Sequence, residues 1–163
     1  MRRSRFAQRL LIATMATLSL LAVGCTAGDW DASVPPGAGV QADSGPVKVR
    51  NLLVISDEDG NAVVSGVITA SEAVTLQGVV LAATKVDGTA GEGVAVDFSA
   101  PIARGKAIAL AGPEVAFVDP ELTPGLLAHV TLGFDDGTRV LLEAPVVSAE
   151  HDDYAQAWAD AQA

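Results

Sequence analysis

The chain has 163 residues, of which half are hydrophobic, and it carries 10 basic and 20 acidic side chains for a formal net charge of −10. Such an acidic chain is a poor nucleic-acid binder, because phosphate backbones are bound by clustered Lys and Arg side chains. The charge favours solubility and does not fix a fold. The single cysteine, Cys25, excludes an internal disulfide.

The N-terminus has the layout of an export signal. Residues 1–9 (MRRSRFAQR) carry four arginines and no acidic residue, and residues 10–23 (LLIATMATLSLLAV) form an apolar run. This run is shorter than the about 20 apolar residues that a membrane-spanning helix usually needs. The pattern therefore predicts a cleaved signal peptide over residues 1–24 rather than a permanent transmembrane helix.

The end of this run, LAVGC, resembles a bacterial lipobox, in which a signal peptidase cuts before an acylated cysteine. We expect lipidation of Cys25, with palmitate or a related acyl chain, and signal peptidase recognition of Leu21, Ala22, Val23 and Gly24. A plain secretory signal is the alternative, but it leaves a lone thiol in an oxidising exterior. Two or more acyl chains anchor a protein stably, so we expect a lipoprotein on the extracytoplasmic face of the cell membrane.

Residues 25–46 are predicted to be the lipidated N-terminus and a flexible tether, because the segment is rich in Gly, Ala, Asp, Ser and Pro and lacks a hydrophobic period. Removing the four signal arginines leaves 6 basic and 20 acidic residues, a formal charge of −14. We therefore expect contact with the membrane through the lipid on Cys25 and not through a basic surface.

Residues 47–147 contain short apolar runs separated by turn residues, which predicts one all-β domain, an antiparallel β-sandwich of cupredoxin-like or immunoglobulin-like type, or a barrel. The runs are VKVRNLLVI, AVVSGVIT, VTLQGVVLAA, VAVDFSAPI, AIAL, EVAFV, LLAHVTLGF and RVLLEAPVV.

A hairpin over residues 126–147 gives the clearest local pattern. In the first arm, apolar residues alternate along one face: Leu126, Ala128, Val130, Leu132 and Phe134. The dipeptide Asp136–Gly137 is typical of a tight hairpin connection. Residues 148–163 are predicted to be an acidic, Ala-rich tail, either frayed or docked, since an isolated helix this short is marginal.

The segment 101–147 resembles the C-terminal half of the periplasmic copper chaperones of the PCuAC family. IARGKAIAL, LTPG, VTLGFDDG and VLLEAPV follow one another in the family's order, and residues 73–81 (AVTLQGVVL) are similar to an earlier strand. With its lipobox and tether, the whole chain resembles actinobacterial lipoproteins of the LpqE type. The resemblance implies a PCuAC-like β-sandwich.

The resemblance does not bring the family's copper ligands with it. That family binds copper through two His and two Met side chains, which suit Cu(I). The only methionines are Met1 and Met15, both within the predicted signal peptide, and neither residue type occurs between positions 110 and 122 or 83 and 91. We therefore expect no family copper site and assign no metal ligand.

Other candidates for chemistry are few. His129 lies mid-strand, and His151 heads an acidic run, EHDD; each is more typical of a surface position than of a ligand. SDEDGN (residues 56–61) has the oxygen-rich character of a calcium loop without its full ligand spacing, and a hairpin turn explains it equally. No catalytic motif or cofactor-binding motif is present, so we expect no catalytic residue and no cofactor.

These observations predict a membrane-anchored, non-enzymatic binding or interaction module whose partner is another envelope protein or a cell-wall component. One alternative is a metal-handling protein with a different ligand set, built from His129, His151 and carboxylates. A second is an accessory factor in respiratory copper delivery that keeps a partner surface without a metal site.

Overall fold

The computed structural model describes residues 38–163. The predicted signal peptide, the predicted lipidation site Cys25 with its recognition residues Leu21 to Gly24, and most of the predicted tether lie outside the described residues. Within residues 38–163, no helix is long and apolar enough to cross a membrane.

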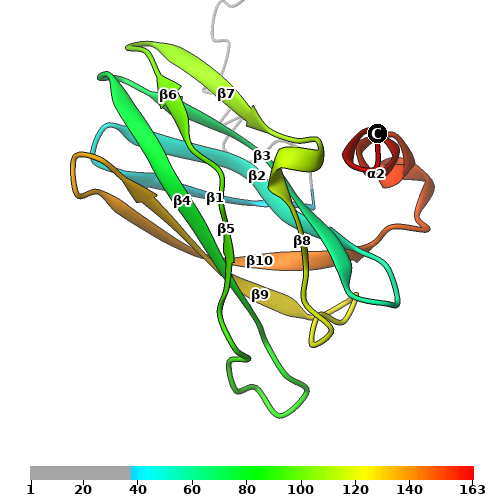
Figure 1. Ribbon diagram of the computed structural model, residues 1–163. Coiled ribbons are helices and arrows are strands. Elements are labelled where there is room, and N and C mark those ends of the chain that lie inside the picture. The colour runs from blue at the N-terminus through cyan, green and yellow to red at the C-terminus, as the bar shows by residue number, and fades with distance from the viewer. Residues whose placement is uncertain (1–37) are drawn as a thin grey trace, which may run out of the picture. The chain divides into compact units, whose positions relative to one another are not determined.

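The described part of the chain is almost entirely β-structure (Figure 1). Its strands are β1 (Val40–Ser44), β2 (Val47–Ser56), β3 (Asn61–Ala70), β4 (Val74–Ala83), β5 (Val94–Val96), β6 (Ala100–Ile102), β7 (Lys106–Leu110), β8 (Ala116–Val118), β9 (Leu127–Phe134) and β10 (Arg139–Ser148). Three short helical segments complete it: η2 (Pro113–Val115), η3 (Asp152–Tyr154) and α2 (Ala155–Ala161). The prediction of an all-β domain is therefore confirmed.

The strands form two layers that are joined along β10. Sheet A contains β1, β2, β3, β7 and β8, and sheet B contains β4, β5, β6, β9 and β10. The first part of β10 pairs antiparallel with β9, and its end pairs parallel with β2, with Val146 opposite Val54. Pro145 stands at this change of partner, where its missing N–H costs no ladder hydrogen bond. The sheet is therefore continuous and barrel-like, with one parallel pair that the sequence did not predict.

The predicted hairpin is confirmed as β9 and β10. Their pairing places Val140 opposite Leu132 and Leu142 opposite Val130. The inward residues predicted by alternation are buried, except Leu126, which is half-buried and precedes the strand. Gly137 closes the turn with a φ of 84°, which the absence of a side chain permits.

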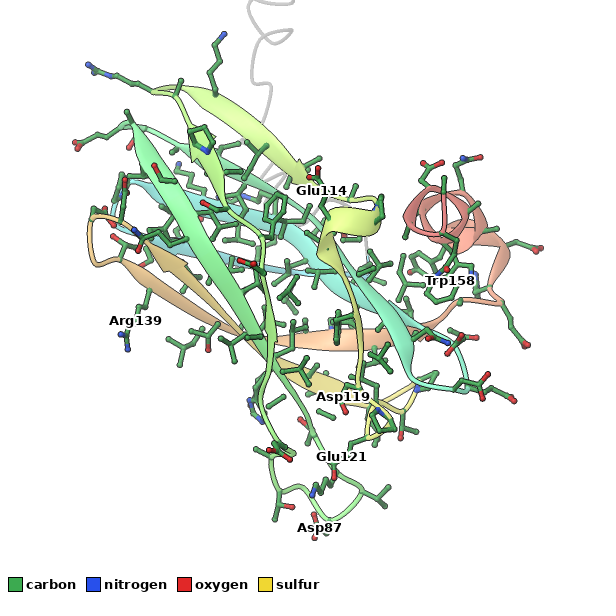
Figure 2. The ribbon with its side chains drawn as sticks, viewed as in Figure 1. Asp87, Glu114, Asp119, Glu121, Arg139 and Trp158 are labelled. Atoms are coloured by element: carbon green, nitrogen blue, oxygen red, sulfur yellow. The ribbon has the colours of Figure 1, made fainter. Side chains whose placement is uncertain are left out.

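The folded region extends beyond both predicted boundaries. Residues 40–44, predicted to belong to the tether, form β1 along the edge of β2, and an ion pair between Arg50 and Asp43 joins these strands. At the other end, α2 packs against η2 and β3, Ala161 is buried, and Trp158 packs partly buried against the core. Figure 2 shows the Trp158 side chain directed from α2 toward the sheet. The C-terminal tail is therefore docked.

Candidate functional site

The two histidines lie in separate surroundings. His129 is on the outer side of β9, with Nδ1 3.8 Å from Oε1 of Glu143 on β10. His151 precedes η3, and its Nδ1 accepts a hydrogen bond of 3.2 Å from the Asp153 amide. In the part of the chain that the structure describes, no group of three or more His, Cys, Asp or Glu side chains is placed to hold a metal ion.

The segment between residues 110 and 122 runs through η2 and β8, and it contributes to packing. Val115 is fully buried in the core, and Phe117 packs partly buried against it. Aliphatic and aromatic side chains thus pack into the core from the segment in which the family resemblance implies a His and a Met. No methionine is present among residues 38–163.

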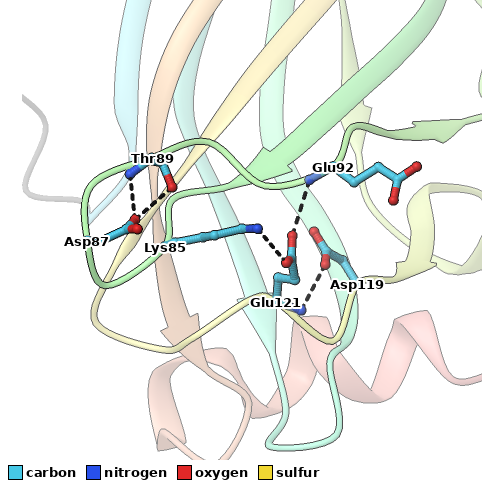
Figure 3. A network of polar contacts seen from close by, with 6 residues as sticks. All are labelled: Lys85, Asp87, Thr89, Glu92, Asp119 and Glu121. Atoms are coloured by element: carbon cyan, nitrogen blue, oxygen red, sulfur yellow. Dashed lines mark hydrogen bonds and ion pairs between the residues drawn. The ribbon is translucent and has the colours of Figure 1, made fainter.

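A polar network joins the β4–β5 loop to the β8–β9 loop (Figure 3). Lys85 Nζ lies 2.8 Å from Glu121 Oε1, and Glu121 Oε2 accepts a hydrogen bond of 3.1 Å from the Glu92 amide. The bond to Lys85 lowers the pKa of Glu121, and the same bond raises the pKa of Lys85. Because the side chains are well exposed, this ion pair fixes loop geometry more than it adds stability.

Asp119 is the buried member of the network, with only 3% of its surface exposed. Its Oδ1 accepts a hydrogen bond of 2.9 Å from the Glu121 amide, while Oδ2 has no hydrogen-bond partner within the described residues. Within residues 38–163 neither Asp119 nor Glu121 belongs to a group of three or more His, Cys, Asp or Glu side chains that could hold a metal ion. The network therefore holds the β4–β5 loop and the β8–β9 loop together.

The SDEDGN segment is a hairpin turn between β2 and β3. Asp57 Oδ1 accepts hydrogen bonds from the amides of Asp59 and Asn61, and Oδ2 accepts one from the Asn61 side chain. This last bond lowers the pKa of Asp57. Both oxygens of the carboxylate are thus used to close the turn, and the turn interpretation of this segment is confirmed.

A cleft with a volume of about 640 Å³ lies on the outer face of sheet B. Two rows of residues, each paired across β4, β9 and β10, cross this face. The first row is Gly78, Gly133 and Arg139, and the second is Val80, Thr131 and Leu141. We call these six positions the glycine face.

Two glycines form the floor of the cleft. An added Cβ at Gly78 or at Gly133 would meet no atom within 4 Å, and neither residue has a positive φ. Neither internal packing nor backbone conformation therefore requires glycine at either position. Glycine inside a strand weakens the sheet, and it often marks either a β-bulge, such as the one between Leu76 and Gly78, or a place where a ligand or another backbone approaches closely. No bulge is present at Gly133 in its pairing with β10.

The glycine face is apolar at one side and basic at the other. Leu141 is 73% exposed and Val80 is 44% exposed, and both rank among the most exposed large hydrophobic side chains of the described domain. Arg139 points away from the domain at the end of the hairpin (Figure 2). It is the only cationic side chain lining the cleft, and it forms no ion pair within residues 38–163.

Sequence reasoning did not select these residues. The available signal was an isolated glycine within each of two strand patterns, VTLQGVV and VTLGF, which can indicate a close backbone approach. Only the register between β4 and β9 brings Gly78 opposite Gly133. A β-bulge between Leu76 and Gly78 places both Gln77 and Gly78 on the outer side, where they line the cleft.

No protein-family model matches the chain, and no curated protein matches it. Among solved structures, the chain is similar to an apo PCuAC domain from PmoF1, with a TM-score of 0.50 and 19% identity over 67% of this chain and 99% of that one. It is also similar to a copper-bound PCuAC domain from PmoF2, with a TM-score of 0.46 and 14% identity over 67% and 98% of the two chains. An apo PCuAC domain from PmoF2 is similar as well, with a TM-score of 0.43 and 14% identity over 69% of this chain and 98% of that one. The domain therefore has a PCuAC-like fold, as the sequence resemblance implied.

Proposed function

We propose that this protein is a membrane-anchored, non-enzymatic binding module that presents its PCuAC-like domain at the extracytoplasmic face of the cell membrane. Its partner is another envelope protein or a cell-wall component, and the contact surface is the glycine face. The observation that carries the proposal is the cleft floored by Gly78 and Gly133, because an added Cβ at either position would meet no atom within 4 Å, so packing within the domain does not require the open floor.

The anchoring part of the proposal rests on the lipobox-like sequence before Cys25. A Cys25→Ala precursor is expected either to remain unprocessed or to appear in the soluble fraction, whereas the natural chain is recovered with membranes and carries a lipid. Mass spectrometry of the mature N-terminus and fractionation of cells measure this. Membrane retention of a correctly cleaved Cys25→Ala product contradicts the lipoprotein assignment.

The binding part is tested in cells with a photo-crosslinking amino acid placed at position 141, at the edge of the glycine face. Crosslinking to one defined envelope component is the expected result. The matched control carries the same amino acid at position 67, where Val67 is an exposed side chain of sheet A. If both positions give the same products, or if position 141 gives none, the glycine face is not the contact surface.

The alternative is metal handling with ligands other than those of the PCuAC family. The side chains of His129 and Glu143 offer two donor groups on the outer side of sheet B. We expect a Cu(I) and divalent-metal titration of the mature chain to give only weak, salt-sensitive association with the acidic surface. Tight binding of one ion that is lost in a His129→Ala or His151→Ala variant favours metal handling instead.

A further inference from the structure

We infer that the cleft on sheet B binds an extended peptide segment of a partner protein, with one carboxylate placed at Arg139 and aliphatic side chains placed against Val80 and Leu141. This inference rests on the proposed function, since it assigns a ligand chemistry to the same face. The carboxylate belongs to an Asp or Glu side chain or to a chain terminus.

The floor of the cleft fits the main chain of a peptide. Because Gly78 and Gly133 lie side by side on β4 and β9, the surface between them consists of backbone alone. Those backbone groups already pair within the sheet, so a peptide lies across the face and does not extend the sheet at an edge. A volume of about 640 Å³ is within the range of about 300–1,000 Å³ that is usual for ligand sites.

The spacing of the row fits a short extended segment. Residues paired across adjacent strands are about 4.8 Å apart, so the row from Gly78 through Gly133 to Arg139 spans roughly 10 Å. An extended chain covers that distance in about three residues. A carboxylate two or three residues beyond the part of the peptide that lies over the glycines therefore reaches the guanidinium.

The charges around the cleft favour a ligand that carries a single carboxylate. Asp135 lines the cleft together with Arg139, and Asp136 follows it in the hairpin turn. Both carboxylates are used in local bonds: Asp135 Oδ1 accepts from the Thr75 amide at 2.8 Å, and Asp136 Oδ1 accepts from the Thr138 amide at 2.8 Å. The Arg139 guanidinium is thus available for a two-pronged bond to a carboxylate. The strongly acidic remainder of the chain repels a ligand with many negative charges, so the fitting segment is otherwise uncharged.

The second row of the glycine face, Val80, Thr131 and Leu141, is the reason that we expect aliphatic side chains in the bound peptide. Val80 and Leu141 flank Thr131, and their exposed methyl groups offer apolar surface directly beside the glycine floor. A β-branched or aliphatic side chain next to the carboxylate removes this surface from water, which stabilises the complex. The combination resembles a small binding site that is mostly apolar with one charge to fix orientation.

The inference is tested by selecting random linear peptides on the chain from residue 25 onward, with Cys25→Ser in place of the predicted lipidated residue. The enriched peptides are expected to share one Asp, Glu or free C-terminus beside aliphatic residues. Calorimetry then measures synthetic copies of them. Gly133→Val fills the floor and is expected to weaken binding about tenfold or more, and Arg139→Gln is expected to weaken it by a similar factor.

The design separates loss of binding from loss of folding. A side chain at position 133 meets no neighbouring atom at Cβ, and Val favours strands, so Gly133→Val is expected to unfold at the same or a higher temperature. Gly78→Ala is a second variant that adds a smaller side chain to the floor of the cleft, on β4 instead of β9. Lys106→Gln on β7 is the matched charge control, since Lys106 is exposed and lies on the other sheet, and it should leave affinity unchanged.

The inference is overturned if no peptide is enriched, if the enriched peptides lack a carboxylate, or if they bind Gly133→Val and the parent chain equally. The crosslinking experiment at position 141 remains separate. A defined crosslink in cells together with a failed peptide selection refutes the peptide chemistry and leaves the proposed function in place, whereas failure of both refutes the two together.

Discussion

Gly60, in the turn between β2 and β3, offers a sharp test of how this domain is held together. Its φ is 81°, and an added Cβ would lie 2.5 Å from the Asp119 carbonyl oxygen and 2.7 Å from Pro120 Cα. An alanine in the left-handed region costs about 1–2 kcal/mol. The contact with rigid backbone adds roughly 1–3 kcal/mol, by analogy with overpacked cores. Gly60→Ala should therefore lower the free energy of unfolding by about 2–5 kcal/mol.

Gly105 in the β6–β7 turn supplies the control. Its φ is 69°, but a Cβ there meets no atom within 4 Å, so Gly105→Ala should cost only the conformational part, about 1–2 kcal/mol. Urea unfolding of both variants measures the difference directly, provided that the slope m is unchanged. Equal losses in the two variants would refute the close approach of the turn to Asp119, and with it the packing that positions the Asp119–Glu121 loop.

Three further predictions concern the core, the tail and the response to acid. Leu132→Ala should lower the free energy of unfolding by about 2–5 kcal/mol, whereas Leu141→Ala on the exposed side should change it by less than about 0.5 kcal/mol; similar losses in denaturant melts would contradict the assigned faces. Trp158→Ala should speed proteolysis and amide exchange over residues 150–163, and unchanged rates would argue against docking of α2. Because native bonds lower the pKa of Glu121 and of Asp57, their stabilisation is complete at neutral pH and is lost as the pH falls below about 4. Thermal melts should show this decline, and Glu121→Gln should reduce it; a stability that rises on acidification would contradict the sign.

The parts of the fold that follow from local pattern were predictable. Strict alternation from Ala128 to Phe134 identified the buried side of β9, and Asp136–Gly137 identified its turn, because both signals lie within a few residues of the chain. The all-β class followed from repeated short runs of the same kind.

The remaining features depend on pairing between distant segments. β1 was missed because VQADS has little hydrophobic pattern, and its strand conformation comes from pairing with β2 and the ion pair between Asp43 and Arg50. The change of partner within β10 and the docking of Trp158 likewise require the assembled sheet. The cleft could not be predicted for the same reason, since Gly78 and Gly133 become neighbours only through the β4–β9 register.

The distribution of side chains over this fold indicates where a function is to be sought. Near β8, where the PCuAC resemblance implies soft metal ligands, Val115 is fully buried and contributes packing energy. Replacing this packing by polar ligands would be costly, because each buried aliphatic side chain stabilises the fold. The glycine face has the opposite property: an added Cβ at Gly78 or Gly133 would meet no atom within 4 Å, and glycine at position 133 is less favourable in a strand than a residue with a side chain. A feature that the fold does not need, and that weakens the sheet, is explained best by something outside the chain. The glycine face is therefore a stronger candidate for function than the segment around η2 and β8.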